Sequence, residues 1–468
     1  MKSADNLDEI INAFEPEALD GKDPLFDKYY HAKTMPSRMG NATASPLRNL
    51  ERRCLTPATR NAHLLVGHRG CGKSTELNHL RKGFEEQKHP VTVIDCQTEL
   101  AIMALSHWDM MLVISDALCK IAKNRNCPLP DSLLEKLERF FTEIEVTTET
   151  STESNVMVQV GAKAQTPTLL AQVLELFVRA KGDLKRSSER RETIRKKINH
   201  RAHDLSDIIK EINDQLKSVL NDKQPILIFE NLDKAPPEKV WDAFSSGLLE
   251  DMPFPVIYTF PINAFYEGRF HTLKNTFTSH LLPMIKTQNK DGGRNDEGIE
   301  VIREIVRRRS AVDALFDPDA LTLLIKKTGG SLRELFDCII ACSFSALDRA
   351  ELAGGNKKTR IEVEDAQIVL KQLRSALSRR IVEGQFGMLK EIYQSAPAKE
   401  IISDREMLLE LMQSGAVIEY NGERWCAVHP LIVDYLKEVK ELPKEQSDGS
   451  AGERPDYVER ESQTSQQQ

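Results

Sequence analysis

The sequence has no hydrophobic run long enough to cross a membrane and no C-x-x-C motif. No stretch approaches the ~18 consecutive apolar residues of a membrane helix. The first residues also lack the basic start and apolar core of a secretory signal. The eight cysteines form no C-x-x-C pair, which argues against a zinc site or a disulfide framework. We therefore expect a cytoplasmic protein with reduced thiols and no membrane contact.

Neither sign of charge dominates the chain. Its 64 Lys and Arg residues stand against 71 Asp and Glu, a net charge of −7. This balance argues against a protein whose whole surface binds nucleic acid, although a local basic patch remains compatible with it. The hydrophobic fraction is 40% and the charged fraction 29%, which is typical of a globular protein. At ~100–200 residues per domain, 468 residues predict two to four domains.

A complete phosphate-binding motif, G-x-x-x-x-G-K-[ST], begins at residue 67. A short apolar run precedes it and a helical pattern follows it, as in a strand, loop and helix. Such a loop directs backbone N–H groups at the β-phosphate of a nucleotide, its lysine reaches the β- and γ-phosphates, and its hydroxyl ligates Mg²⁺. We therefore predict binding of ATP and Mg²⁺ by Gly67, His68, Arg69, Gly70, Cys71, Gly72, Lys73, Ser74 and Thr75.

An acidic residue at the end of a second buried strand should complete the nucleotide site. Residues 226–229 are apolar and are followed by Glu230 and Asp233. We predict that Ser74 holds Mg²⁺ together with Glu230 or Asp233. Asp more often takes the first acidic position, and the additional methylene of Glu230 could alter the metal geometry. Capping of the next helix, which Pro236 and Pro237 favour, is the alternative role of Asp233.

Several motifs in this order resemble the AAA+ ATPases of the origin-recognition initiator type. They are the phosphate-binding motif, the acidic strand IFENLDK, the strand VIYTFPIN, the segment Gly329-Gly330-Ser331-Leu332-Arg333 and a C-terminal winged-helix pattern. The E-x-L-D spacing also resembles the D-G-L-D pattern of STAND and NACHT NTPases. The resemblance covers about residues 46–440. It implies an α/β P-loop AAA+ core with a helical insertion, a helical lid and a C-terminal winged-helix domain.

The resemblance also implies roles for polar residues outside the phosphate-binding loop. Thr259 takes the position of the sensor-1 residue, with Asn263 as the second candidate. Arg333 resembles sensor 2, which brings a cation from the lid to the phosphates. A partner subunit would receive an arginine finger from Arg269 or from residues 307–309, and the sequence does not choose between them. With Glu230 and Asp233, Thr259 and Arg333 form the expected catalytic set.

The predicted organisation follows from changes in composition along the chain. Prolines at 16, 24, 36 and 46 predict an extended start with little helix beyond residues 6–15. The wide spacing between Lys73 and Glu230 predicts an insertion at about 128–221. The expected units are an N-terminal extension (1–45), the core with this insertion (46–290), the lid (291–358), the winged-helix domain (359–440) and a disordered tail (441–468).

Two surfaces are candidates for macromolecular partners. Residues 181–201 carry nine Lys or Arg against three acids, which indicates either a solvated helix face or a phosphate-backbone contact within Lys185 to Arg201. The winged helix is the second candidate for DNA. Its expected recognition helix, 404–414, has one Arg and three acids, which disfavours base reading in the major groove. The insertion is instead a candidate surface for a protein partner.

The sequence therefore predicts an ATP-binding molecular switch with slow Mg²⁺-dependent hydrolysis to ADP and phosphate. Nucleotide state would set the position of the lid and the winged helix. The protein could be associated with DNA. The alternative is a STAND-type signalling or defence switch that binds protein partners and forms homo-oligomers in response to nucleotide. A scaffold that binds nucleotide without hydrolysis also remains open, because Glu230 and Asn231 stand where Asp and Glu are usual.

Overall fold

The computed structural model describes most of the chain. The described residues are 3–39, 45–56, 60–145, 168–186, 188–199, 202–221, 223–354, 359–394, 404–420 and 425–443. The Thr- and Ser-rich segment 146–167, residues 421–424 with the sequence Asn-Gly-Glu-Arg, and the predicted disordered tail from 444 onward lie outside these ranges. None of the helices in these ranges is long and apolar enough to span a bilayer.

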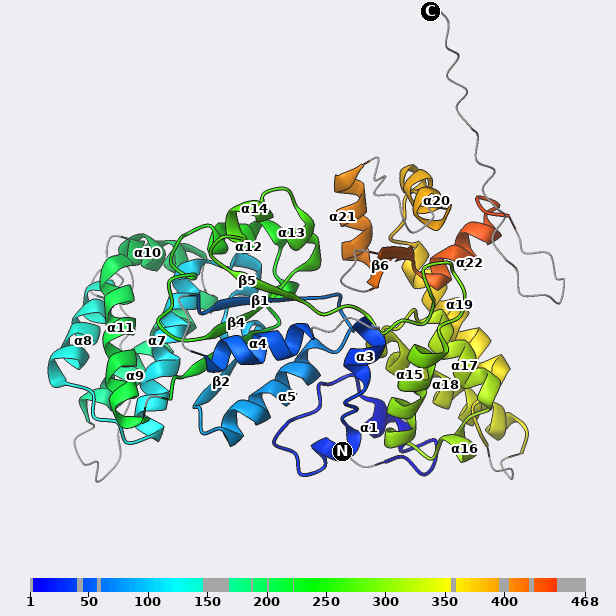
Figure 1. Cartoon of the computed structure of the whole chain (residues 1–468), viewed down its shortest axis with the longest axis horizontal. Coiled ribbons are helices and arrows are strands. Elements are labelled where there is room, and N and C mark those ends of the chain that lie inside the picture. Colours follow the sequence, from blue (N-terminus) through cyan, green and yellow to red (C-terminus); the bar gives the residue numbers. More distant parts are fainter. Residues whose placement is uncertain are drawn as a thin grey trace, which may run out of the picture.

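A parallel five-stranded sheet forms the centre of the molecule (Figure 1). Its strands in spatial order are β2 (Val91–Asp95), β3 (Ile226–Glu230), β4 (Val256–Phe260), β1 (Ala62–Val66) and β5 (Thr278–Leu281). The α/β class predicted from the sequence is confirmed. β1, β3 and β4 coincide with apolar runs of the sequence, because central strands buried on both faces are largely apolar. β2 is an edge strand and is only partly buried. β5 was not predicted, since Thr278, Ser279 and His280 are polar.

Both faces of the sheet are covered by helices. On one face, Leu65, Ile228 and Ile257 pack with residues of α4 (Pro46–Leu55) and α5 (Lys73–Glu86). On the other face, Phe229 and Tyr258 belong to the cluster formed with the helices that follow β2, β3 and β4. Those segments are α6 (Cys96–Glu99), η1 (Ile102–Ala104), α7 (His107–Asn124), η2 (Leu232–Lys234), α12 (Pro237–Phe244), α13 (Ile262–Tyr266) and α14 (Phe270–Leu273).

Four helices between α7 and β3 form a bundle with α7 at one end of the molecule (Figure 1). They are α8 (Asp131–Glu145), α9 (Leu169–Arg186), α10 (Ser188–Asn199) and α11 (Ala202–Val219). The insertion predicted at about 128–221 thus contains these four helices. Phe141 and Phe177 meet in the bundle core with ring centroids 4.7 Å apart.

The N-terminal segment lies between the sheet domain and the helices that follow β5 (Figure 1). It contains α1 (Ile10–Phe14), α2 (Phe26–Tyr29) and α3 (Thr34–Met39). The expectation of little helix beyond residues 6–15 was therefore wrong. Pro24 precedes α2 and Pro36 lies in the first turn of α3, where a missing backbone N–H breaks no helical hydrogen bond.

Helices dominate the chain after β5. The first group is α15 (Asp296–Arg309), α16 (Val312–Leu315), α17 (Pro318–Lys327) and α18 (Leu332–Leu352), which we call the lid. The second group is α19 (Val363–Ser378), η3 (Glu383–Gln385), α20 (Phe386–Gln394), α21 (Arg405–Ser414), β6 (Val417–Tyr420), β7 (Trp425–Val428) and α22 (Pro430–Glu438), which we call the winged-helix domain. β6 and β7 pair in antiparallel orientation, as the strand-like runs in the sequence predict.

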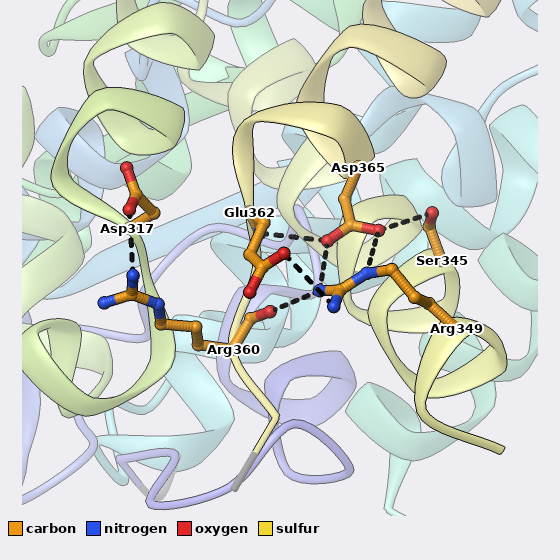
Figure 2. Close-up of polar contacts among 6 residues, drawn as sticks. All are labelled: Asp317, Ser345, Arg349, Arg360, Glu362 and Asp365. Atoms are coloured by element: carbon orange, nitrogen blue, oxygen red, sulfur yellow. Dashed lines mark hydrogen bonds and ion pairs between the residues drawn. The ribbon is translucent and has the colours of Figure 1, made fainter. Parts of the chain in front are cut away.

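An ion-pair cluster joins the lid to the start of the winged-helix domain (Figure 2). Arg349 of α18 bonds to the buried carboxylate of Asp365 in α19 at 3.0 Å and to Glu362 at 3.2 Å. Arg360, in the connecting segment, pairs with Asp317 at the start of α17 at 3.0 Å. The Asp365 carboxylate also accepts the backbone N–H of Glu362 and so caps α19.

Candidate nucleotide-binding site

The phosphate-binding loop connects β1 to α5, as the motif predicts. Gly70 and Gly72 adopt positive φ angles of 79° and 92°, which glycine accepts without steric cost. A Cβ atom on Gly70 would lie 2.6 Å from the Ser331 hydroxyl, so a side chain there would collide with the lid. The N-terminus of α5 follows directly and directs its backbone N–H groups toward the loop. The loop therefore has the backbone geometry of an anion cradle.

Lys73 is buried and held by acceptors of its own loop and of the next strand end. Its Nζ donates to the carbonyl oxygens of Gly67 at 2.8 Å and His68 at 2.9 Å, and it pairs with Asp233 Oδ2 at 2.9 Å. Burial alone would lower the pKa of Lys73, but the neighbouring Asp233 carboxylate more than offsets this and raises it. A phosphate entering the loop would compete with Asp233 for this ammonium group.

The acidic residues after β3 lie close to the loop. Glu230 ends the strand, and its Oε1 atom is buried without a hydrogen-bond partner among the described residues. Burial raises the pKa of Glu230 to about 7, with Asp95 and Asp233 contributing in the same direction. Hard cations such as Mg²⁺ take oxygen ligands, and of the three predicted ligands Ser74 and Asp233 line the cavity described below, whereas Glu230 does not. Ser74 and Asp233 are thus compatible with the metal, and the role of Glu230 stays a prediction.

Asn231 follows Glu230 in a left-handed conformation with φ of 62°. Its side-chain nitrogen donates to Asp95 Oδ1 at 2.7 Å, and Asp95 lies beside Glu230 in the register of β2 and β3. The sequence analysis did not select Asp95. Asp95 ends a strand-like run of the sequence, and parallel strands end at the same edge of a sheet. The sequence could therefore have placed Asp95 beside Glu230.

Thr259 lies at the centre of this strand-end cluster. Its hydroxyl donates to the Phe229 carbonyl oxygen at 3.1 Å and accepts the Leu232 backbone N–H at 3.0 Å. The side chain lines the cavity described below and also fixes the turn that carries Asp233. Asn263, the second sensor-1 candidate, instead donates to Gln413 of α21 at 3.2 Å.

A cavity of about 300 Å³ opens beside the loop. Its walls come from five parts of the chain: the N-terminal segment, the phosphate-binding loop with the start of α5, the η2 segment with Asn231, the end of β4 and the lid. The N-terminal part includes Pro16, Tyr30 and Arg38, and the lid part includes Arg309 and Arg333. The volume is at the lower end of the range for small-molecule sites.

The N-terminal wall is held firmly against the loop. Arg38 is fully buried and donates to the carbonyl oxygens of Cys71 at 2.6 Å and Pro283 at 2.5 Å. The hydroxyls of Tyr30 and Thr34 both donate to the Glu76 carboxylate of α5 at 2.8 Å. None of these residues was predicted to contribute to the site. In the sequence, the signs of this wall are the adjacent Tyr29 and Tyr30 and the isolated Arg38, which lie upstream of the phosphate-binding motif.

The candidate arginines differ in their environments. Arg333 is exposed near the start of α18, and the backbone beside it contacts the loop through the Leu332 N–H, which donates to Gly70 O at 3.1 Å. Arg269 bonds to Glu238 and Glu267 and lies over the Trp241 ring. Arg309 is buried over Phe336 and donates to Ala13 O at 2.9 Å.

The other two arginines of residues 307–309 also bind within the chain. Arg307 pairs with Glu300 at 2.6 Å, and Arg308 pairs with Glu304 at 3.1 Å. An arginine finger from this segment would therefore have to leave existing partners.

The winged-helix domain touches the phosphate-binding loop itself. His68 Nε2 accepts the backbone N–H of Glu419 in β6 at 2.9 Å. Burial lowers the pKa of His68 to about 3, with Lys73 contributing in the same direction, so the ring is neutral and can accept this bond. Tyr420 donates to Gly329 O at 2.6 Å, and His429 lies 3.0 Å from Glu334 of the lid. The loop, the lid and β6 thus form one continuous contact.

Four of the nine basic residues at 181–201 are engaged within the chain. Lys181 bonds to Asp116 at 2.5 Å and to Glu99 at 2.9 Å, while Arg195 Nε bonds to Asp109 at 3.2 Å. Arg190 pairs with Asp183, and Arg191 donates to a backbone carbonyl oxygen. A contact of these four residues with a phosphate backbone would therefore have to compete with existing partners. Lys181 and Arg195 stabilise the bundle against α6 and α7.

Comparisons with known proteins add little to this geometry. No protein-family model matches the sequence, and no curated protein matches it. The solved structures that match include the crystal structure of Cdc6p from Pyrobaculum aerophilum, which is 12% identical. That match covers 92% of this chain and 96% of the other, with a TM-score of 0.38. A likeness of this degree carries no argument, so the proposed function rests on the site.

Proposed function

We propose that this protein is an ATP-binding switch in which nucleotide and the winged-helix domain act on the same loop. The observation that carries the proposal is the double use of His68. Its carbonyl oxygen accepts a hydrogen bond from Lys73, and its ring accepts one from β6 of the winged-helix domain. Any change that phosphate binding imposes on this loop reaches the winged-helix domain without an intermediate element.

The cavity provides a place for each part of Mg·ATP. The loop backbone and Lys73 would bind the phosphates, and Ser74 with Glu230 or Asp233 would hold Mg²⁺. The nucleoside would lie toward the N-terminal wall, where Tyr30 and Leu19 line the cavity. Mg²⁺ would neutralise the charge of the phosphates and orient them for attack by water.

Several residues support slow hydrolysis. Asn231 lines the cavity but cannot accept a proton as a carboxylate would, and its amide is bonded to Asp95. Thr259 fixes the turn that carries Asp233, and Asp233 pairs with Lys73. Arg333, on the lid, would join the phosphates when the lid closes. The reaction would convert ATP to ADP and phosphate at a low rate and so set the lifetime of the ATP-bound state.

The output of the switch is better explained by a protein partner than by DNA. Lys181, Arg191 and Arg195 are engaged within the bundle. In the winged-helix domain, α21 is packed against α13, and Arg405 donates to the Tyr266 carbonyl oxygen. The positions that α21 leaves exposed include Glu406 and Glu410, whose negative charges disfavour contact with a DNA backbone. The bundle α8–α11 is the surface where we would place the protein partner.

Steady-state hydrolysis of Mg·ATP tests this proposal, with Lys73→Ala compared against Lys82→Ala on the same helix. Lys82 pairs with Asp27 and does not line the cavity. We expect turnover that only Lys73→Ala abolishes and that duplex DNA leaves unchanged at two salt concentrations. Stimulation by DNA that salt suppresses would favour the DNA-associated alternative. Unchanged ATP binding in Lys73→Ala would contradict the nucleotide site.

A further inference from the structure

Three cationic side chains meet at the phosphate end of the cavity. Arg69 belongs to the phosphate-binding loop, Lys234 to η2 and Arg333 to the lid, and all three line the same cavity as Lys73 and Ser74. They also line an adjoining groove of about 680 Å³ between the core, the lid and the winged-helix domain. They therefore lie between the phosphate end of the cavity and the adjoining groove.

Lys234 is the member of this group that the core holds in place. It ends the short η2 segment, whose backbone is fixed at two points: Asn231 bonds to Asp95, and the Leu232 N–H bonds to the Thr259 hydroxyl. The side chain extends from this support to Gln97, where its Nζ donates to Oε1 at 2.6 Å. Arg333 belongs to the lid, whereas Lys234 is held by the strand end that carries Asp233.

The charge of Lys234 is not neutralised in this conformation. Within the described part of the chain its ammonium forms no ion pair, and Gln97 is a neutral partner. The adjacent carboxylate of Asp233 is bonded to Lys73 at 2.9 Å. Burial lowers the pKa of Lys234, and Arg333 and Arg69 lower it further, although Asp233 and Asp95 act in the opposite direction. An anion placed among these cations would relieve their mutual repulsion.

We propose that Lys234 binds the terminal phosphate of a bound nucleoside triphosphate and so makes the site prefer triphosphate to diphosphate. The inference rests on the proposed function, because it assumes that the loop binds nucleotide. The ammonium group exchanges the neutral Gln97 oxygen for a charged phosphate oxygen, and charge-assisted hydrogen bonds are stronger than neutral ones. A diphosphate ends one phosphate earlier and leaves Lys234 on Gln97.

Calorimetric titration with Mg·ATP and Mg·ADP tests the inference in the intact protein. We expect Lys234→Met to weaken ATP binding about 10-fold and ADP binding less than about 2-fold. Lys234→Arg should retain most of the preference, because it keeps the charge. Lys239→Met is the matched control: Lys239 lies on α12, pairs with Asp242 and does not line the cavity. It should leave both affinities unchanged.

The outcomes separate this inference from the proposed function. Loss of ATP binding in Lys73→Ala, together with unchanged binding in Lys234→Met, would overturn the role of Lys234 and leave the nucleotide site intact. Equal weakening of ATP and ADP would also overturn it, because triphosphate would not be distinguished. ATP binding that does not depend on Lys73 would instead overturn the proposed function. If Lys234→Met does not fold, Lys234→Gln provides the same comparison.

Discussion

Replacing His68 with alanine should release the winged-helix domain from the phosphate-binding loop. The ring accepts the Glu419 backbone N–H at 2.9 Å, and His68 is only 5% exposed. The substitution leaves that N–H buried without a partner, which costs about 1–3 kcal/mol. A loss of this size shifts the docking equilibrium roughly 5- to 150-fold toward the undocked form. The substitution removes no backbone atom from the loop, so phosphate binding itself should persist.

Amide hydrogen exchange of a peptide covering β6 measures this shift. We expect exchange to be faster by a factor in that range in His68→Ala, while peptides from α17 in the lid exchange as in the unmodified protein. His89→Ala is the control, because His89 is also buried but bonds to Gln224 O, far along the chain from β6. Equal exchange of β6 in His68→Ala and the unmodified protein would refute the role given to this bond.

The same bond gives docking a pH dependence with a definite sign. In the docked state burial lowers the pKa of His68 to about 3, whereas an exposed histidine titrates near 6.5. Protons therefore bind the undocked form first, and docking weakens as the pH falls below 6.5, by about tenfold per unit. After correction for intrinsic exchange, this dependence should be seen in the unmodified protein and absent in His68→Ala.

Three further predictions concern the stability and chemistry of the core and lid. Asp365→Ala should lower the free energy of unfolding by about 2 kcal/mol in urea titrations, because the buried carboxylate is bonded to Arg349, whereas the exposed Asp348→Ala should not. In the unmodified protein the free energy of unfolding should fall by about 2 kcal/mol between pH 7.5 and 5, and His63→Leu should remove this fall. Burial lowers the pKa of His63 to about 3, so in the unmodified protein unfolding binds a proton as the pH falls through 6.5; an unchanged pH slope would contradict this. The double substitution Asn231→Asp with Asp95→Asn keeps the hydrogen bond between the two side chains and places a carboxylate at the cavity. Hydrolysis should then accelerate about 10²-fold. Unchanged turnover would exclude Asn231 as the cause of a low rate.

The parts of the site that lie within one motif were predictable from the sequence. The phosphate-binding loop is local, and its glycines, lysine and hydroxyl are fixed by spacing alone. β1, β3 and β4 were recognised because they are buried on both faces and therefore largely apolar, whereas β2 is an edge strand that is only partly buried. β5 escaped recognition because His280 and its neighbours are polar, although His280 is buried and bonded to Pro46 O.

The remaining walls of the site depend on contacts that no local pattern reveals. His68 and Glu419 are 351 residues apart in the sequence, and Arg38 reaches Pro283 across 245 residues. The basic residues of 181–201 show a further limit of the sequence. It gives their charge, but not the distant residues with which they pair. Arg195 is paired with Asp109, which lies 86 residues earlier.

The central claim is that nucleotide and the winged-helix domain act on one loop, such that phosphate drawing Lys73 away from the His68 carbonyl oxygen weakens the bond between the His68 ring and β6. Its most direct test compares amide hydrogen exchange of β6 with and without saturating Mg·ATP, in the unmodified protein and in Lys73→Ala. We predict that ATP accelerates exchange of β6 in the unmodified protein and has no effect in Lys73→Ala. Bound ATP that leaves β6 unchanged, or protects it further, would contradict the account.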